Sequence, residues 1–461
     1  MSEPQREVAS FRDPAGFIFQ RDGIVYRQVN RVYQAHFDAL VDSGLYQQLT
    51  RNGQLIPHDV VDIPAPQPDT AYCIIQPQHV PFISYPYEWT FGQLKDAALL
   101  TLALQQQAFA KGMTLKDASA YNIQFIAGKP TLIDTLSLEL YEEGRPWVAY
   151  RQFCQHFLAP LALAAYRDIR LQQLLRVYID GLPLDMVSSL LPARTRLRFG
   201  LLTHLHLHAR SQKRYANHPT NTRLSERKIS RNSMIGLIAN LESTIRALKW
   251  NPDATPWADY YQGDSYKNAG FVDKQRLVEQ FIDRVQPRII WDMGANTGVF
   301  SRIAATKGCT VISWDSDPGA VELNYQQVKA NAEYNVLPLI IDLTNPSPAL
   351  GWSHQERQSL IGRSNADCIL ALALIHHLAI GNNVPLCDVA AFFATLSPYL
   401  IIEFVPKEDV KVQHLLMNRA DIFADYTKEG FEHAFAEYYT IIEAVEIEQS
   451  QRYLYLMKCK S

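Results

Sequence analysis

The chain has 461 residues, of which 47% are hydrophobic and 20% are charged, and its formal net charge is −3. This composition excludes a disordered or fibrous protein, and the length predicts two or three globular domains. No apolar run approaches the roughly 20 residues of a membrane span and no basic, apolar leader opens the chain, so we expect a cytoplasmic protein.

Residues 16 to 79 contain short apolar runs separated by turn residues, which predicts a small unit of strands and helices. Apolar residues between positions 94 and 109 recur at helical spacing. Two short apolar runs follow at 123–126 and 131–133, and the glycine-containing turn between them predicts a β-hairpin.

Polar residues flank this hairpin. Asp117 is followed five residues later by Asn122, and Asp134 closes the second run. The segment resembles the catalytic and metal-binding segment of the kinase-like phosphotransferase fold. The resemblance implies that Asp117 would orient an acceptor hydroxyl, while Asn122 and Asp134 would hold magnesium.

The resemblance has gaps. Leu115 stands at the position of the family's histidine, no glycine-rich phosphate loop is present near residues 17–26, and Arg27 is the basic residue nearest to the expected lysine. Phosphoryl transfer without these groups loses most of its electrostatic stabilisation. We therefore expect a degenerate kinase-like module. An active phosphotransferase and a polar cap on a plain hairpin are the alternatives.

Residues 152–187 and 195–249 are predicted to be largely helical. His204, His206 and His208 alternate within the second stretch. On a helix, side chains two positions apart diverge by about 200° and cannot converge on a metal ion. We expect no metal site there.

Basic residues are concentrated from Arg194 to Arg231, where Glu226 is the single acidic residue. This excess predicts a face for an anionic partner, such as a nucleic acid or a phosphate group. A solvated surface whose charge is balanced elsewhere in the fold is the alternative.

Residues 289 to 300 have the pattern of a strand, a tight turn and the start of a helix. The apolar run ends at Asp292, and the turn carries Gly294 and Gly298. A second apolar run ends at Asp315, 23 residues after Asp292. In a βαβ unit, such glycines let a nucleotide-like ligand approach the backbone, and the second acid holds a ribose diol.

The segment from Asp292 to Gly298 resembles the first motif of the class I S-adenosylmethionine-dependent methyltransferases. One glycine fewer than in the dinucleotide fingerprint, and an acid before the loop, favour S-adenosyl-L-methionine over a dinucleotide. The resemblance covers about residues 255–461. It implies an α/β fold, namely a Rossmann-like domain with a mainly parallel seven-stranded sheet. It assigns these residues to the cofactor: Asp292, Gly294, Ala295, Asn296, Thr297, Gly298, Asp315, Ser316, Asp342, Leu343 and Ala373.

The remaining strands of such a sheet are predicted from further apolar runs, at residues 336–341, 366–375, 399–404, 439–446 and 452–458. By the same resemblance, the last two form an antiparallel pair that closes the sheet.

Methyl transfer from a sulfonium needs mainly alignment and desolvation, because the leaving group is already good. A base is needed only where the nucleophile must lose a proton. His376 and His377, after the predicted fourth strand, and Glu403, after the fifth, are the candidate catalytic residues. A structural role in turns is the alternative. No Asn-Pro-Pro-Tyr or Asp-Pro-Pro-Tyr follows the fourth strand, which leaves a small molecule, a protein or RNA as acceptor.

The sequence thus predicts a kinase-like α+β domain at residues 1–160, a helical connector at 161–250 and a methyltransferase domain at 251–461. We expect a methyltransferase with an unidentified acceptor. The alternatives are a non-catalytic regulatory or binding protein that retains a cofactor pocket, and a bifunctional kinase-like and methyltransferase protein. Six scattered cysteines lack the spacing of a zinc or redox site and predict free thiols.

Overall fold

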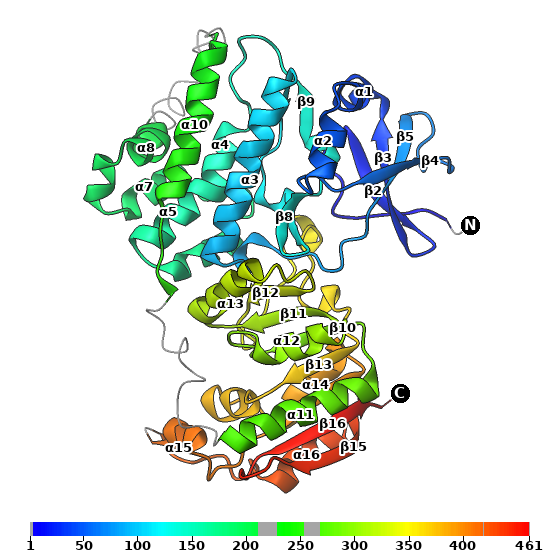
Figure 1. Ribbon diagram of the computed structural model, residues 1–461, viewed down its shortest axis with the longest axis vertical. Helices are drawn as coiled ribbons and strands as arrows, with labels where there is room; N and C mark the ends of the chain where they lie inside the picture. Colours follow the sequence, from blue (N-terminus) through cyan, green and yellow to red (C-terminus); the bar gives the residue numbers. More distant parts are fainter. Residues whose placement is uncertain (1–2, 211–227, 253–267, 418, 461) are drawn as a thin grey trace. The chain divides into compact units, whose positions relative to one another are not determined.

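The computed structural model describes residues 3–210, 228–252, 268–417 and 419–460 (Figure 1). The chain forms two compact units. The first comprises Met1–Trp250 together with Leu350–Arg357, and the second comprises Asn251–Ala349 together with Gln358–Ser461.

The first unit begins with an antiparallel sheet of five strands in the order β1-β2-β3-β5-β4. Its strands are β1 (Gln5–Arg6), β2 (Gly16–Arg21), β3 (Ile24–Asn30), β4 (His58–Val61) and β5 (Ala71–Pro77). A short helical segment, η1 (Arg31–Tyr33), and two helices, α1 (Gln34–Asp42) and α2 (Leu45–Arg51), separate β3 from β4 in the chain. The predicted unit of mixed strands and helices is confirmed.

A long helix and a hairpin follow. Helix α3 (Phe91–Ala110) starts at Thr90, whose side chain accepts the backbone N–H of Gln93. The hairpin pairs β7 (Ile123–Ile126) with β8 (Lys129–Leu132). Its turn residues, Ala127 and Gly128, have φ of 50° and 72°, as a two-residue hairpin turn requires. A second short pair joins β6 (Met113–Leu115) to β9 (Leu138–Leu140).

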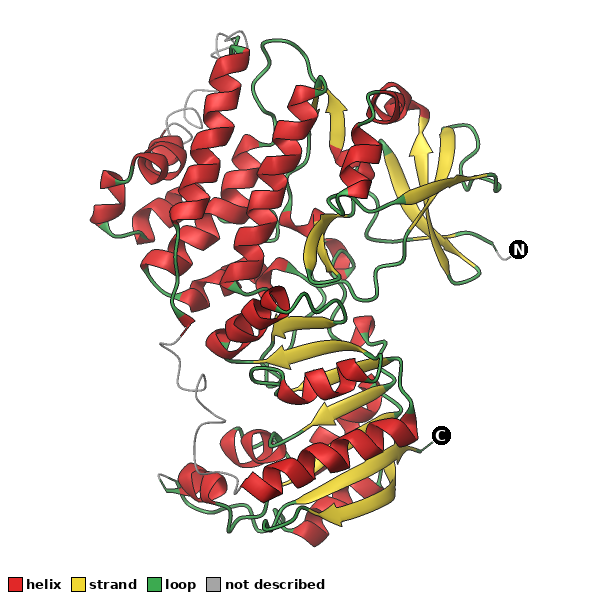
Figure 2. Cartoon of the chain, in the orientation of Figure 1, coloured by secondary structure: helices red, strands yellow, loops and turns green. Residues whose placement is uncertain are grey.

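The rest of the first unit is mainly helical, as predicted. Figure 2 shows its five-stranded sheet at one end of the unit and most of its helices at the other. These elements are α4 (Tyr150–Phe153), η5 (Cys154–Leu158), α5 (Ala159–Tyr166), η6 (Ile169–Gln173), α6 (Leu174–Val177), α7 (Leu184–Leu190), η7 (Ala193–Leu197), α8 (Phe199–Leu201), η8 (Leu202–Leu207) and α10 (Arg231–Ala247). In the part of the chain that the structure describes, no helix is long and apolar enough to cross a membrane.

The second unit is built on a sheet of seven strands in the order β12-β11-β10-β13-β14-β16-β15. The strands are β10 (Ile289–Met293), β11 (Thr310–Asp315), β12 (Val336–Ile340), β13 (Cys368–Ala371), β14 (Tyr399–Phe404), β15 (Tyr439–Glu446) and β16 (Tyr453–Cys459). The first five are parallel, and β16 runs antiparallel to both β14 and β15. The predicted sheet and its antiparallel pair are confirmed.

Helices cover both faces of this sheet, which explains why its central strands are apolar throughout. Figure 1 shows α11 (Asn268–Val285) and α12 (Val299–Thr306) in front of the sheet, with α14 (Leu386–Leu396) and α16 (Lys428–Ala436) behind it. Phe281 and Phe300 belong to the core of the front face. The other helices of the unit are α13 (Pro318–Ala330) and α15 (Val410–Leu416), and its shorter helical segments are η12 (Trp352–His354), η13 (Ile361–Arg363) and η14 (His377–Gly381).

The fourth strand is shorter than predicted. The apolar pattern indicated a strand over residues 366–375, whereas β13 ends at Ala371. Ala373, two residues later, has a left-handed backbone with φ of 50°, which cannot continue a strand. The apolar residues beyond Ala371 form a turn at the carboxyl edge of the sheet.

Candidate functional site

A cavity of about 240 Å³ lies at the carboxyl ends of strands β10, β11, β12 and β13. In open α/β sheets, ligands bind in the crevice outside these strand ends. Predicted cofactor residues that line the cavity are Asp292, Gly294, Ala295, Asn296, Asp315, Ser316, Asp342, Leu343 and Ala373. Thr297 and Gly298 are not among the lining residues; Gly298 directly precedes helix α12.

Two glycines determine the backbone conformation of the loop after β10. Gly294 and Gly298 have φ of +81° and +83°, in the left-handed region that glycine adopts without strain. A Cβ atom at Gly298 would lie 2.6 Å from side-chain atoms of Arg302 and Asn324. A Cβ atom at Gly294 would lie 3.4 Å from Leu374. The backbone conformation therefore favours glycine at both positions, and at Gly298 the packing against Arg302 and Asn324 also leaves no room for a side chain.

Asp315 fixes this loop to the end of β11. Its Oδ2 accepts the backbone N–H of Asn296 at 2.8 Å, and its Oδ1 accepts that of Asp317 at 2.9 Å. Burial raises the pKa of Asp315 from its ordinary value, although these hydrogen bonds oppose the rise. The carboxylate thus holds the loop and also faces the cavity.

Asp292 is a buried acid at the end of β10. Burial raises its pKa to about 7, and a hydrogen bond from Ser301 Oγ to its Oδ2 at 2.6 Å opposes that rise. Asp315 raises the pKa further and Lys274 lowers it. Asp292 therefore changes its charge near neutral pH, at the wall of the cavity.

The acid after the third strand is placed differently. Asp342 is exposed, and its Oδ1 accepts the backbone N–H and the hydroxyl of Thr344 at 2.9 Å and 2.7 Å. Because Leu343 and Thr344 also line the cavity, this turn forms the wall opposite β13.

The three candidate catalytic residues occupy different positions. His377 lines the cavity, whereas His376 and Glu403 do not. Burial lowers the pKa of both histidines, and more so for His376, which is fully buried. The two rings lie 4.2 Å apart between centroids. Neither ring nitrogen of His376 has a hydrogen-bond partner among the described residues.

Glu403 is fully buried and its carboxylate is occupied by protein groups. Its Oε2 accepts from Lys274 Nζ at 2.5 Å and from the backbone N–H of Ala373 at 2.7 Å. Its Oε1 accepts from Arg452 Nη1 at 3.2 Å. The sequence prediction gave Glu403 a role in positioning substrate, but the structure places its carboxylate behind the cavity wall.

Lys274 lines the cavity and was not predicted from the sequence. It lies on α11, where Phe271, Val278 and Phe281 mark the apolar face. A lysine at helical spacing among these apolar residues was the signal that could have identified it. Burial lowers the pKa of Lys274, while Glu403 opposes that effect.

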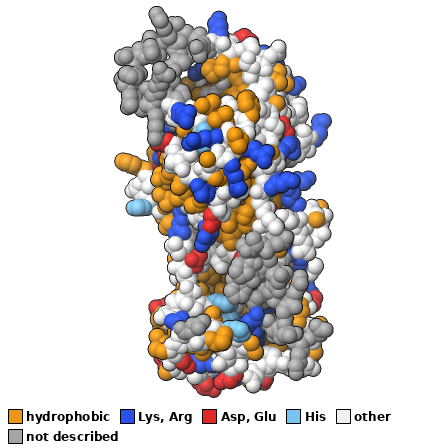
Figure 3. Space-filling model, turned by 90° about the vertical axis from the view of Figure 1, so that its left-hand side faces the viewer, with side chains coloured by type: hydrophobic (Ala, Val, Ile, Leu, Met, Phe, Trp, Pro, Cys, Tyr) orange, Lys and Arg blue, Asp and Glu red, His pale blue; other side chains and the backbone are white. Residues whose placement is uncertain are grey.

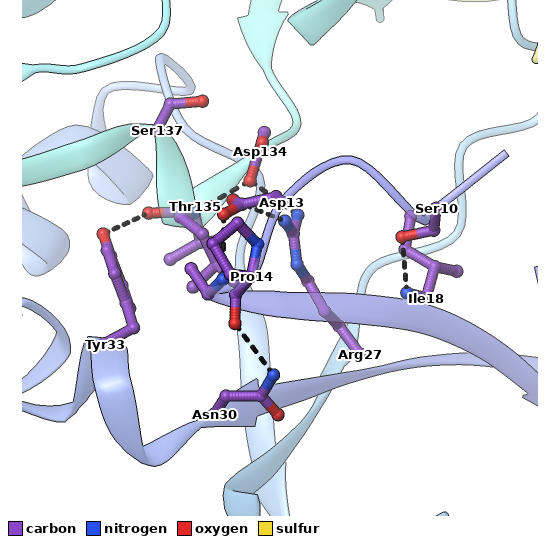
Figure 4. A network of polar contacts seen from close by, with 12 residues as sticks. Ser10, Asp13, Pro14, Ile18, Arg27, Asn30, Tyr33, Asp134, Thr135 and Ser137 are labelled. Carbon is purple, nitrogen blue, oxygen red and sulfur yellow. Dashed lines mark hydrogen bonds and ion pairs between the residues drawn. The ribbon is translucent and has the colours of Figure 1, made fainter. Parts of the chain in front are cut away.

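The kinase-like segment of the first unit forms an ion-pair network (Figure 4). Arg27 on β3 donates to Asp134 Oδ1 at 2.5 Å and lies 4.0 Å from Asp13. Lys116 pairs with the same Asp13 at 3.3 Å. The Asp134 carboxylate therefore already has a cationic partner from the protein.

The other two polar residues of this segment also bind protein groups. Asp117 Oδ1 accepts the backbone N–H of Ser119 at 2.8 Å, and Asn122 Nδ2 donates to Ser137 Oγ at 3.2 Å. Burial raises the pKa of Asp117. No group of three or more His, Cys, Asp or Glu side chains placed to hold a metal ion occurs among the described residues.

The alternating histidines form separate structural contacts. His204 bonds to Tyr150 Oη at 2.8 Å and to Asn240 Oδ1 at 2.7 Å. His206 bonds to Ser188 and Thr195 at 2.8 Å and 2.9 Å.

The structure describes only part of the basic segment from Arg194 to Arg231. Arg194, Arg196, Arg198 and Arg210 are exposed. In the upper part of Figure 3, Lys and Arg side chains are scattered over the helices of the first unit, and Asp and Glu side chains are fewer there. Arg231 instead donates to the Phe109 carbonyl at 3.1 Å. Lys213, Arg214, Arg223, Glu226 and Arg227 lie outside the described residues.

The strand order and the glycine loop define the second unit as having the class I S-adenosylmethionine-dependent methyltransferase fold, as the sequence predicted. No family model matches the chain. Nodulation protein NoeA of Rhizobium meliloti (strain 1021) is 35% identical over 459 residues, which are 98% of this chain and 96% of that protein. The chain belongs to the family of NoeA.

Solved structures resemble parts of the chain. WbdD is 15% identical, with a TM-score of 0.30, over 43% of this chain and 42% of that one. Magnesium protoporphyrin IX methyltransferase (ChlM) from Synechocystis PCC 6803 is 15% identical, with a TM-score of 0.32, over 45% and 95%. N-methyltransferase NodS from Bradyrhizobium japonicum WM9 is 11% identical, with a TM-score of 0.31, over 42% and 99%.

Proposed function

We propose that the chain is an S-adenosylmethionine-dependent methyltransferase acting on an acceptor that the site does not identify. The observation that carries the proposal is the cavity at the carboxyl ends of the parallel strands, lined by a glycine loop, the buried Asp292 and the half-buried Asp315. Asp292 and Asp315 suit a ligand with an ammonium, a sulfonium and a ribose diol, because carboxylates accept hydrogen bonds and balance positive charge.

In this proposal, different residues of the site contact different parts of the cofactor. The backbone from Gly294 to Asn296 lies against the amino-acid end of the cofactor, Asp315 accepts from the ribose, and the turn from Asp342 to Leu343 contacts the base. Ala373 lines the wall towards the histidines. When bound, S-adenosylmethionine supplies an electrophilic methyl group with a good leaving group.

His377 is the best-placed base for an acceptor that must lose a proton. It lines the cavity, and burial lowers its pKa, so its imidazole is neutral at physiological pH and can accept a proton. His376 is fully buried, and its ring lies 4.2 Å from that of His377. The acceptor is a small molecule, a protein or RNA.

Calorimetry with S-adenosylmethionine tests the cofactor assignment. Wild-type protein should bind it, and Asp315→Ala should bind about tenfold to a hundredfold more weakly, because a charge-assisted hydrogen bond contributes roughly 1.5 to 3 kcal/mol. Loss of the Asn296 contact adds to this effect. Equal affinity of the two proteins would remove Asp315 from the site.

Turnover is tested separately. Mass spectrometry of extracts from cells with and without the protein should show a species heavier by one methylene unit, and Asp315→Ala should remove it. Cofactor binding without such a species would favour the rival, a regulatory protein that retains the pocket.

We further propose that the first unit combines a degenerate kinase-like domain, residues 1–160, with a helical connector, residues 161–250, ahead of the methyltransferase domain at 251–461. The ion pair between Arg27 and Asp134 supports the degenerate assignment, because it neutralises the carboxylate that the resemblance assigns to magnesium. Six free cysteines support a reducing, cytoplasmic location. The exposed arginines between Arg194 and Arg210 support an anionic partner.

A further inference from the structure

A buried charge network lies behind the cavity wall of the second unit. The Glu403 carboxylate on β14 bonds to Lys274 on α11 and to Arg452, directly before β16. Arg452 Nε also donates to Asp409 Oδ2 at 2.7 Å. The exposed fractions of the Lys274, Glu403 and Arg452 side chains are 2%, 0% and 2%. Charges buried this deeply persist only when each is compensated, so the network has one well-defined arrangement.

The same carboxylate also holds a strained backbone. Ala373 has φ of 50°, a conformation in which its Cβ atom crowds the backbone. Its N–H donates to Glu403 Oε2 at 2.7 Å, the oxygen that also accepts from Lys274. Left-handed backbone at a residue other than glycine persists where surrounding contacts determine it. Here the contact comes from a side chain 30 residues away in the sequence.

This strained residue lies in the wall of the cavity. Leu372, Ala373, Leu374, His377 and Leu378 all line it. Leu374 O accepts the N–H of His377 at 2.9 Å, so the direction of the chain at Ala373 sets the position of the histidine. Leu374 also lies next to Gly294 of the glycine loop.

We propose that Glu403 is a positioning residue of the cofactor site, which holds Ala373 in its left-handed conformation and thereby places the wall from Leu372 to Leu378 for S-adenosylmethionine. The ion pairs with Lys274 and Arg452 orient its carboxylate. Glu403 contacts neither cofactor nor acceptor in this role. The inference rests on the proposed function, whose cofactor it takes as the ligand of the cavity.

The test uses Glu403→Asp in the full-length chain. Aspartate keeps a carboxylate to pair with Lys274 and Arg452, but its shorter side chain withdraws from the N–H of Ala373. The dissociation constant for S-adenosylmethionine, measured by calorimetry, should rise about tenfold to a hundredfold, the range for loss of a charge-assisted hydrogen bond.

Ala373→Gly supplies the rescue. Glycine adopts positive φ without a hydrogen bond to hold it. Combined with Glu403→Asp, Ala373→Gly should recover most of the lost affinity, and the single variant Ala373→Gly is measured beside it as the reference for the double variant. A purely structural role of Glu403 predicts no such recovery.

Asp367→Ala is the matched control. The Asp367 carboxylate accepts the backbone N–H groups of Arg288 and Ile289 at 2.8 Å and 2.9 Å. These residues lie at the amino-terminal end of β10, whereas the cavity lies at its carboxyl end. This variant should lower the melting temperature and leave the dissociation constant unchanged.

The outcomes separate the two proposals. Failure of wild-type protein to bind S-adenosylmethionine contradicts the proposed function. If wild type binds, then unchanged affinity of a folded Glu403→Asp, or a double variant no tighter than Glu403→Asp alone, overturns the positioning role. Should Glu403→Asp not fold, Glu403→Gln and its combination with Ala373→Gly are measured in the same way and judged by the same two outcomes.

Discussion

Asp292 carries the clearest pH dependence at the scale of single residues. Burial raises its pKa to about 7, so the folded protein keeps a proton that the unfolded chain releases near pH 4. Between these values the native state binds more protons than the unfolded state. The contribution of Asp292 to the free energy of unfolding should therefore fall as the pH rises from about 4 to about 7, and Asp292→Asn should remove this contribution when denaturant unfolding is measured at several pH values.

Cofactor affinity should depend on pH in the opposite direction. A cationic ligand prefers the ionised Asp292, so the affinity for S-adenosylmethionine should fall by about tenfold from pH 8 to pH 6. Calorimetry at several pH values measures this. Asp315 and Lys274 face the same cavity, but Asp292→Asn alone should flatten the profile if Asp292 is the titrating group. A profile that stays as steep in Asp292→Asn would contradict the assignment.

The residues around the cavity also show why single side chains were hard to assign from the sequence. Asp292 and Asp315 were predicted because their positions follow from strand ends. Glu403 was predicted as a residue near the acceptor, yet its carboxylate bonds to Lys274 and Ala373. Those partners lie 129 and 30 residues away, and no local pattern encodes such a contact.

The glycine loop is the element that most directly tests the site. Gly294→Val should abolish binding of S-adenosylmethionine, because valine at φ of +81° is strained and its branched side chain meets Leu374 at the cavity. Circular dichroism should show a folded protein.

Gly308→Val provides the control for backbone strain. Gly308 has φ of +85°, and a Cβ atom there would meet nothing within 4 Å. The two variants should lose similar stability, but Gly308→Val should keep normal cofactor affinity. Normal binding by Gly294→Val would show that the loop serves packing alone.

At the scale of the whole molecule, the first unit should not transfer phosphate. The connection between β2 and β3 is only Asp22–Gly23, too short to cover phosphate groups, and Arg27 neutralises Asp134. Purified protein should show no magnesium-dependent consumption of ATP above background. Asp134→Ala should instead destabilise the unit by about 3 kcal/mol, because it leaves the buried Arg27 with only the longer contact to Asp13, at 4.0 Å.

An active phosphotransferase would give a different pattern. ATP consumption that requires magnesium and disappears in both Asp117→Ala and Asp134→Ala would make the chain bifunctional. Each variant would need a normal melting curve for the first unit, so that loss of folding is not mistaken for loss of activity.

The basic segment predicts salt-dependent association of the molecule with an anionic partner. A single-stranded RNA oligonucleotide serves as the probe. Its affinity should fall steeply with salt, and the combined Arg194→Ala, Arg196→Ala and Arg198→Ala variant should reduce the slope by about 2, since each phosphate contact contributes roughly 0.7 for single strands.

The control replaces two exposed lysines of the same unit outside the segment, Lys111→Ala and Lys129→Ala, which should leave the slope unchanged. Failure of wild-type protein to retain the RNA at low salt, or a flat salt dependence, would assign these arginines to a solvated surface.

The sequence by itself determined the second unit's sheet and its glycine loop. Strand apolarity, the spacing of Asp292 and Asp315, and the glycines at 294 and 298 are local patterns, and local patterns follow from backbone geometry over a few residues. The kinase-like spacing of Asp117, Asn122 and Asp134 was also visible in the sequence, but the sequence did not show which protein groups these side chains contact.

Only the tertiary structure decided how these residues are used. Arg27 reaches Asp134 across 107 positions of the chain, and Glu403 reaches Lys274 across 129. The end of β13 was set in the same way, because an apolar run does not reveal that Ala373 turns to positive φ against a distant carboxylate. Burial also fixes the pKa of Asp292 and His376, and burial is a property of the packed fold, which a residue's neighbours in sequence do not determine.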